Sequence, residues 1–149
     1  MKDLIKDITQ KDDKAAFEKV KEIVSKSKIS SEYYPYLEDF ASLLDDEKSY
    51  IRTRAFILCS YLARWDDEKI KNILPSMVKL FNDAKPTVVR KCLEATREIV
   101  TYHPELCPII IESINNIDLT KYKDSMSPLI KKDIEDLTCL INEKYVLKD

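Results

Sequence analysis

The chain repeats one helical pattern. The stretch KPTVVRKCLEATREIVTYHP, residues 85–104, has a near copy in KSYIRTRAFILCSYLARWDD, residues 48–67. In each copy a β-branched residue precedes an arginine, as in Val89–Arg90 and Ile51–Arg52, and apolar residues follow at steps of three and four. Self-similarity with a period of about 40 residues indicates a stacked repeat architecture, in which each unit contacts its neighbours.

Two weaker copies extend the pattern toward both ends of the chain, at Asp13–Lys14 and Ile130–Lys131. The aligned copies are apolar in nearly all of the same columns at helical spacing; the first two columns hold Phe17, Ala55, Leu93 and Ile134, and then Val20, Leu58, Thr96 and Leu137. Such one-sided stripes are stable only when a neighbouring helix covers them. The sequence therefore predicts one all-α domain spanning residues 1–149, with repeats at approximately 1–27, 30–65, 67–103 and 105–144.

Each repeat also needs a first helix that precedes the copied one. The candidates are residues 2–9, about 31–44, about 67–82 and about 105–116. All four segments carry clustered apolar residues, so we expect four helical hairpins stacked side by side.

A polar column recurs with the apolar ones. It holds a carboxylate before each copied helix and a basic residue at its start: Asp7, Asp45, Asp83 and Asp124, with Lys14, Arg52, Arg90 and Lys131. An active site would not need to recur in every repeat, whereas helix ends and repeat contacts do. We therefore predict a structural ladder of turn capping and ion pairs between repeats.

Composition excludes several classes of function. The formal net charge is −2 with acids and bases interleaved, and glycine is absent. A nucleic-acid footprint needs a basic face, and phosphate-binding loops need glycine. No run is apolar enough to span a membrane, and the charged start is unlike a signal peptide, so the expected location is the cytoplasm.

The residues that most often carry catalysis or metals are isolated. The four cysteines, Cys59, Cys92, Cys107 and Cys139, form no C-x-x-C pair and are predicted to be small core residues. The single histidine, His103, ends a helix, where it would offset the helix dipole or face water. Adjacent aspartates are expected to cap helices. We predict no metal, no cofactor and no enzymatic activity.

These features resemble the HEAT-repeat (armadillo-like) family. The resemblance lies in the turn residues Asp45 and Asp83, the pairs Ile51–Arg52 and Val89–Arg90, and the apolar ladder after them. It covers essentially the whole chain and is strongest over residues 31–104. The chain is also similar to small bacterial HEAT-type proteins that sometimes carry a SufBD label, although its cysteines do not cluster. The resemblance implies a right-handed α-α superhelix, or solenoid, of about four HEAT-like helical hairpins that binds proteins.

In a HEAT arrangement the second helices line the concave face, and the 100° step per residue gives their outward positions. The residues predicted there are Glu18, Glu22, Thr53, Phe56, Ser60, Arg64, Lys91, Glu94, Glu98, Tyr102, Lys132 and Glu135. One hypothesis is a shallow acidic groove, with Phe56 as an aromatic anchor, for a basic or amphipathic peptide. The alternatives are a solvated face with ordinary charge pairs, and Phe56 packed beneath a neighbouring helix.

The favoured function is a non-enzymatic scaffold or adaptor that is monomeric and binds another protein or peptide. The alternative is a HEAT-like DNA-binding protein or an alkylation-repair-type DNA glycosylase, in which Tyr61, Arg64, Trp65 and Asp66 would surround a damaged base. An acidic second-helix face is unfavourable for binding phosphates. Self-association through the terminal repeats is a third possibility.

Overall fold

A computed structural model describes the backbone of residues 2–148 and the side chains of residues 3–144. This part of the chain is helical, with eight α-helices, short 3-10 turns and no strand. The helices are α1 (Lys2–Thr9), α2 (Asp13–Ser27), α3 (Leu37–Ala41), α4 (Ser49–Leu62), α5 (Lys69–Val78), α6 (Pro86–Tyr102), α7 (Cys107–Asn115) and α8 (Ser127–Lys148). The predicted all-α class is confirmed.

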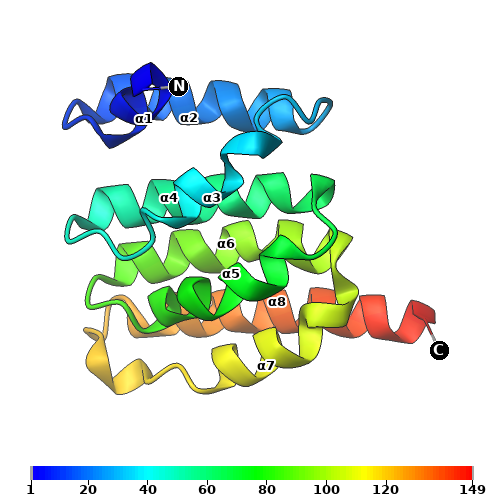
Figure 1. Cartoon of the computed structure of the whole chain (residues 1–149). Helices are drawn as coiled ribbons and strands as arrows, with labels where there is room; N and C mark the ends of the chain where they lie inside the picture. The colour runs from blue at the N-terminus through cyan, green and yellow to red at the C-terminus, as the bar shows by residue number, and fades with distance from the viewer. Residues whose placement is uncertain (1, 149) are drawn as a thin grey trace.

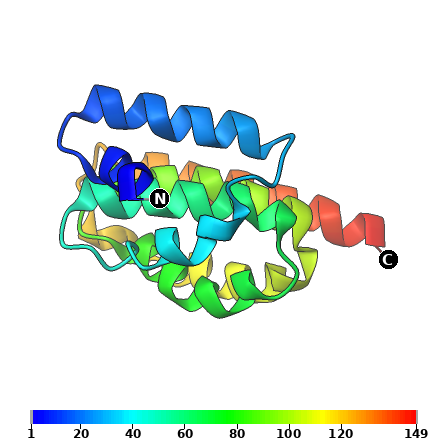
Figure 2. The same cartoon turned by 45° about the horizontal axis from the view of Figure 1, so that its top comes forward.

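The helices form two layers, which gives the molecule the shape of an α-α solenoid. The second helices α2, α4, α6 and α8 lie side by side and run in the same direction (Figure 1). Helices α3, α5 and α7 lie in front of them as a second layer, as the turned view shows (Figure 2). The first helices are shorter than expected, because parts of their segments are 3-10 turns, such as Tyr34–Tyr36 before α3 and Lys79–Asn82 after α5.

One hydrophobic core runs between the layers. Leu58, Leu93 and Leu137 from three successive second helices are each at most 1% exposed, so the predicted apolar stripes do cover one another. Phe17 is an exception, because it was expected in the core and is 58% exposed, while Ala16 is fully buried. Asp12 and Lys48 are equivalent N-cap residues, so Phe17 corresponds to Thr53, which lines a groove between the second helices, rather than to Ala55 in the core.

Polar contacts tie the α1–α2 hairpin to α4 at one end of α2. The buried Arg54 donates from Nη1 to the carbonyl oxygens of Ile8 and Gln10, at 2.8 and 2.9 Å, and from Nη2 to Asp13 Oδ1 at 3.0 Å. Carbonyl groups at the end of a helix lack intrahelical donors. Arg54 thus satisfies the end of α1 and holds the start of α2.

The other end of α2 is held in a similar way. Trp65 Nε1 donates to the Ser27 carbonyl oxygen at 2.6 Å, and Arg64 Nη1 donates to the Lys28 carbonyl oxygen at 2.6 Å. Both acceptors lie at the carboxyl end of α2. The hairpin is therefore fixed to α4 and its following turn by side chains at both ends of α2.

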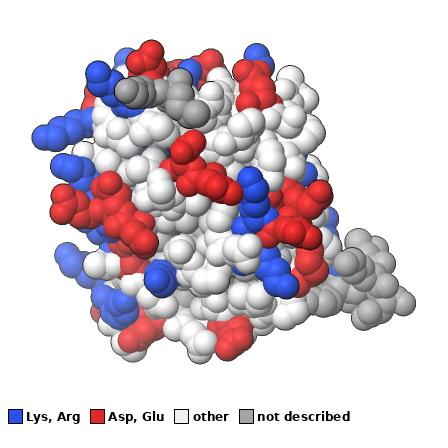
Figure 3. Space-filling view, viewed as in Figure 1, with Lys and Arg blue, Asp and Glu red and all other residues white. Residues whose placement is uncertain are grey.

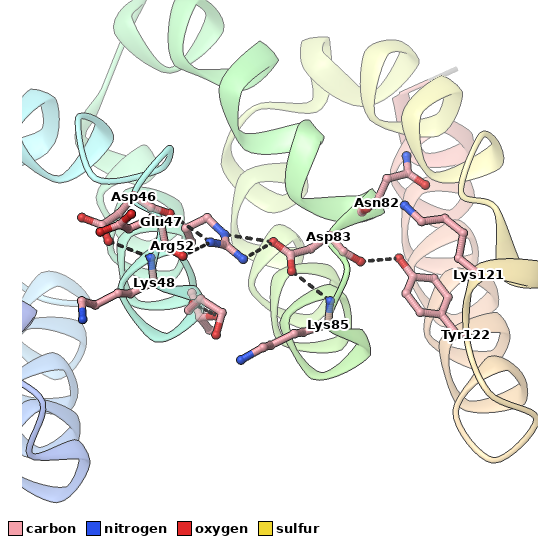
Figure 4. Close-up of polar contacts among 11 residues, drawn as sticks. Asp46, Glu47, Lys48, Arg52, Asn82, Asp83, Lys85, Lys121 and Tyr122 are labelled. Atoms are coloured by element: carbon pink, nitrogen blue, oxygen red, sulfur yellow. Dashed lines mark hydrogen bonds and ion pairs between the residues drawn. The ribbon is translucent and has the colours of Figure 1, made fainter.

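The predicted charge ladder exists in the centre of the stack (Figure 4). Arg52 in α4 contacts Asp83 Oδ2 from Nε at 2.9 Å and from Nη2 at 2.8 Å, and Asp83 Oδ1 accepts the Lys85 backbone N–H at 3.0 Å. The Tyr122 hydroxyl donates to the Asp83 carbonyl oxygen at 2.8 Å. The turns of three repeats are thereby linked in series.

The ladder is partial elsewhere. The counterpart of Asp83 is Asp46 rather than Asp45, because Asp46 Oδ1 accepts the N–H of the N-cap Lys48 at 2.9 Å. Arg90 pairs with Asp133 in α8 at 2.7 Å rather than with a turn residue. The remaining predicted members form no ion pair with any described side chain: Asp7, Lys14, Asp45, Asp124 and Lys131. The longer connector before α8 displaces the last turn from the ladder.

Candidate protein-binding groove

A groove of about 500 Å³ lies between α2, α4 and α6. We call it the α2–α4–α6 groove; its lining residues are Asp13, Phe17, Val20, Lys21, Val24, Ser49, Tyr50, Thr53, Arg54, Ile57, Tyr61, Thr87, Val88, Lys91, Glu94 and Ala95. They come from the second helices alone. The concave layer that the sequence predicted as the binding face is therefore where the groove lies.

The groove has an apolar strip that solvent reaches. Phe17 is 58% exposed on α2, and Val24, Ile57 and Tyr61 are half-buried beside it. Single exposed apolar residues are ordinary, but several that line one concavity indicate a surface suited to a partner. The strip forms because residues one or two turns apart lie on the same side of a helix. Phe17 and Val24 share one side of α2, and Ile57 and Tyr61 share one side of α4.

Helix α4 is rotated relative to the prediction. Phe56 and Ser60 were expected to face a partner, yet each is at most 1% exposed, and the Phe56 ring packs 6.0 Å from that of Phe81. The prediction was wrong for these two residues because α4 lies between α2, α6 and the first-helix layer. Thr53, which was also expected there, is 7% exposed but does line the groove. Only a narrow strip of α4, which includes Ile57 and Tyr61, reaches the groove.

Helix α6 presents the predicted side. Lys91 and Glu94 are exposed and line the groove. At its carboxyl end, Arg64 Nη2 contacts Glu98 Oε1 at 3.2 Å, and the Arg64 guanidinium lies 4.5 Å from the centre of the Tyr102 ring. The structure thus brings Arg64, Glu98 and Tyr102 together as one cluster at the end of the groove.

The predicted residues of α2 and α8 lie beside the grooves rather than in them. Glu18 and Glu22 are exposed, but α2 lines the groove with their neighbours Phe17 and Lys21. A smaller groove of about 350 Å³ lies between α6 and α8, and it is lined by Thr87, Arg90, Lys91, Leu93, Glu94, Arg97, Met126, Asp133, Asp136 and Leu137. The predicted Lys132 and Glu135 of α8 are exposed but absent from this lining. On both helices the error is one residue, or about 100° of rotation.

Sequence reasoning missed Phe17 and Ile57 as groove residues. Phe17 was placed in an apolar core column, and Ile57 lies in a stretch of α4 that is apolar on nearly all sides. The N-cap signal of Asp12, whose Oδ1 accepts the Ala15 N–H at 3.2 Å, would have corrected the α2 register.

Surface charge gives no support to the DNA-binding alternative. On the face seen in Figure 3, basic and acidic side chains alternate without a continuous basic region. The charged residues that line the groove are Lys21, Arg54, Lys91, Asp13 and Glu94, and Arg54 is paired with Asp13, so positive charge does not accumulate there. Affinity for a phosphate backbone needs an accumulation of positive charge.

Asp66, which the DNA glycosylase alternative would place beside a damaged base, has a structural role. It is 5% exposed; its Oδ2 accepts the Ile70 N–H at 2.7 Å, and its Oδ1 accepts the Tyr34 hydroxyl at 2.6 Å. It therefore satisfies a free N–H at the start of α5, as expected for the adjacent aspartates Asp66 and Asp67, and links α5 to the preceding repeat.

The hydrogen bond between Tyr34 and Asp66 should shift ionisation of the Tyr34 hydroxyl to higher pH. The hydrogen bond to Asp66, followed by burial, raises the pKa of Tyr34 from 10.0 to about 12. Because the folded-state pKa is raised, this contact stabilises the fold below the ordinary pKa and is lost as pH rises toward 12. In an ultraviolet titration Tyr34→Phe should remove the highest-pH phenolate step, while Tyr33→Phe should retain it. Persistence of that step in Tyr34→Phe would show that the contact is absent.

His103 and the cysteines occupy structural positions. His103 is buried; its Nε2 lies 2.7 Å from the Ala63 carbonyl oxygen and its Nδ1 lies 3.0 Å from Glu105 Oε1. It does not face water, because the turn after α4 covers it. Burial raises the pKa of the Cys59 thiol to about 12 and also raises the pKa of Cys92, so both remain thiols. Cys107 is buried and Cys139 is exposed.

Within the described residues, no three histidine, cysteine or acidic side chains are grouped so that they could hold a metal ion. Over the same residues, none of the helices has the length and apolar character that crossing a bilayer requires.

The stacked hairpins, the concave groove and the inter-repeat ladder define a protein of the HEAT-repeat class. A family model described as Cnd1, non-SMC mitotic condensation complex subunit 1, matches residues 29–136. Because this match spans most of the chain, the chain belongs to the Cnd1 family, whose fold is built from HEAT repeats. Neither the curated proteins nor the solved structures gave a significant match.

Proposed function

We propose that the chain is a non-enzymatic protein-interaction module whose α2–α4–α6 groove binds an amphipathic helical segment of another protein. The observation that carries the proposal is the apolar strip: Phe17 is exposed on α2, and the half-buried Ile57 and Tyr61 of α4 line the same groove. An amphipathic helix places apolar residues at i, i+3, i+4 and i+7, which suits a groove parallel to the repeat helices.

The family match supports a protein partner. The family is described as a subunit of a mitotic condensation complex, and the match includes α4 and α6, which form most of the groove. We extend this to a scaffold or adaptor role in a larger assembly. The exposed Phe17 on α2 lies outside the matched residues, so the family match bears on two of the three helices that form the groove.

Phe17→Ala tests the groove. Aromatic anchors of an interface contribute about 2 kcal/mol or more when buried by a partner, so affinity for the captured partner should fall by about thirtyfold or more. Stability should change little, because Phe17 is exposed in the free protein. The measurement is quantitative capture from native lysate, with stability followed by thermal unfolding and the monomeric state checked by sedimentation.

The matched control is Leu129→Ala on α8. Leu129 is 40% exposed and lines neither groove, so its removal deletes a comparable exposed apolar side chain elsewhere. Equal capture by wild type and Phe17→Ala, or an equal loss in Leu129→Ala, would show that the groove is not the binding surface.

A further inference from the structure

We propose that the α2–α4–α6 groove selects an acidic amphipathic helix, in which carboxylates border the apolar stripe and pair with Lys21 and Lys91. The inference rests on the proposed function, because it names the chemistry of the helix that the groove binds. It reverses the charge that the sequence predicted for the partner, and the reversal follows from the charged side chains that line the groove.

The observed rotation of α2 removes much of the acidic lining that the sequence predicted. Glu18 and Glu22 were expected in the groove, but α2 lines it with Phe17 and Lys21 instead. Among the glutamates predicted for the concave face, Glu94 alone lines a groove; those that line neither groove are Glu18, Glu22, Glu98 and Glu135. A shift of one residue on α2 thus replaces carboxylates by an aromatic ring and an ammonium group.

Two cations that line the groove are free to pair with a partner. Arg54 is already paired with Asp13 at 3.0 Å. Lys21 and Lys91 are exposed, and neither forms an ion pair with any described side chain. An exposed ammonium group remains largely hydrated, so it pairs with an incoming carboxylate at a small desolvation cost.

Glu94 does not cancel these charges. It is the carboxylate of the lining that has no ion pair, but Lys91 and Arg97 lie three residues before and after it on α6. Side chains at that spacing are neighbours on a helix surface. Arg97 is exposed, lines the smaller groove and has no ion pair with a described residue, so free cations outnumber free carboxylates here.

Lys21 and Lys91 lie on the two helices that flank the apolar strip. Helix α4, which contributes Ile57, lies between α2 and α6 (Figure 1). Lys21 Nζ is 5.9 Å from the centre of the Phe17 ring, so a carboxylate at Lys21 would border the exposed aromatic ring. A helix packed on Phe17 and Ile57 would meet one ammonium group along each edge. Charges that border the apolar seam of packed helices set the choice of partner.

The same two lysines fit a peptide rather than a nucleic acid. A phosphate backbone is bound through an extended series of cationic contacts, and two ammonium groups on either side of an apolar strip do not provide one. An amphipathic helix supplies what the groove lacks, because it carries apolar residues for the strip and a carboxylate on each side of them.

The test uses three synthetic amphipathic helices of about 18 residues, long enough to span the groove. They share one apolar stripe of leucine and alanine, and the positions that border the stripe hold glutamate, glutamine or lysine. Isothermal titration calorimetry should show that wild type binds the glutamate peptide about threefold to tenfold more tightly than the lysine peptide, with a difference that shrinks as salt is added.

The overall charge of the protein predicts the opposite order. The formal net charge is −2, which would favour the lysine peptide. A preference for glutamate therefore reports the local charge of the groove. Equal binding of the peptides, tighter binding of the lysine peptide, or no measurable binding of the glutamate peptide would overturn the inference.

Charge reversal locates the effect. The double variant Lys21→Glu with Lys91→Glu should bind the lysine peptide more tightly than the glutamate peptide. The control is Lys123→Glu with Lys131→Glu, which makes the same charge change at exposed residues that line neither groove, and it should keep the wild-type order. An unchanged order in the first variant, or the same reversal in the control, would refute the assignment to Lys21 and Lys91.

Phe17→Ala separates this inference from the proposed function. If wild type bound all three peptides equally and Phe17→Ala bound none of them, the groove would remain the binding surface and its preference for acidic helices would be refuted. Unchanged peptide binding in Phe17→Ala, together with unchanged capture from lysate, would refute the groove itself.

Discussion

Replacing Phe56 by alanine is expected to lower the free energy of unfolding by about 3–5 kcal/mol, the usual cost of deleting a fully buried aromatic ring. Phe56 is 1% exposed, and its ring contacts that of Phe81, which belongs to the first-helix layer of the next repeat. The loss therefore leaves a cavity between two repeats. Urea or thermal unfolding, followed by circular dichroism, measures the change.

The comparison variant is Phe17→Ala, which removes an exposed phenylalanine ring instead of a buried one. We expect a change within about 0.5 kcal/mol there, as for most surface substitutions. The two phenylalanines thus separate stability from binding. If Phe56→Ala kept wild-type stability and lost only partner capture, Phe56 would lie on the binding face and the observed rotation of α4 would be incorrect.

The fold was predictable because each apolar stripe must be buried against a neighbouring helix, and because the stripes recur at a similar interval along the sequence. Leu58, Leu93 and Leu137 were assigned to one layer from spacing alone, and all three are buried. Their burial follows from helical periodicity and a repeat of similar length, which are both properties of the sequence.

The rotation of α4 was not predictable to the same degree. Periodicity identifies a buried side only when the opposite side is polar, and α4 is apolar around most of its circumference. Phe56 and Ile57 are adjacent and similarly apolar, yet one is in the core and the other borders the groove. Which of them faces solvent depends on how closely α2 approaches α4, and no local pattern encodes that distance.

The sequence predicted only part of the candidate site, because periodicity places residues only on a helix that has one polar side. Helix α6 has a clear polar side, so Lys91 and Glu94 were placed correctly on the groove face. The contacts that hold α2 were missed, because Arg54, Arg64 and Trp65 donate to backbone carbonyl groups. An acceptor that every residue possesses leaves no signature in the sequence.

Removing the Arg54 side chain is expected to have the second large effect. Arg54→Met keeps the aliphatic length but deletes all the hydrogen bonds to Ile8, Gln10 and Asp13. We expect a loss of about 3 kcal/mol, because the buried Ile8 carbonyl oxygen would be left without a donor. Unfolding experiments give the total change, and hydrogen exchange should show the greatest loss of protection in α1 and α2.

Asp13→Asn distinguishes the ion pair from the carbonyl contacts. The Asp13 side chain is 90% exposed, so its pairing with Arg54 should contribute at most about 1 kcal/mol. Arg97→Met is the matched control, since Arg97 is exposed and forms no ion pair with a described side chain. If Asp13→Asn cost as much as Arg54→Met, the ion pair and not the helix-end carbonyls would hold the hairpin.

Because α2 forms one wall of the groove, Arg54→Met should also weaken partner capture even though Arg54 is buried. Arg97→Met should leave the hairpin and its protection from hydrogen exchange unchanged.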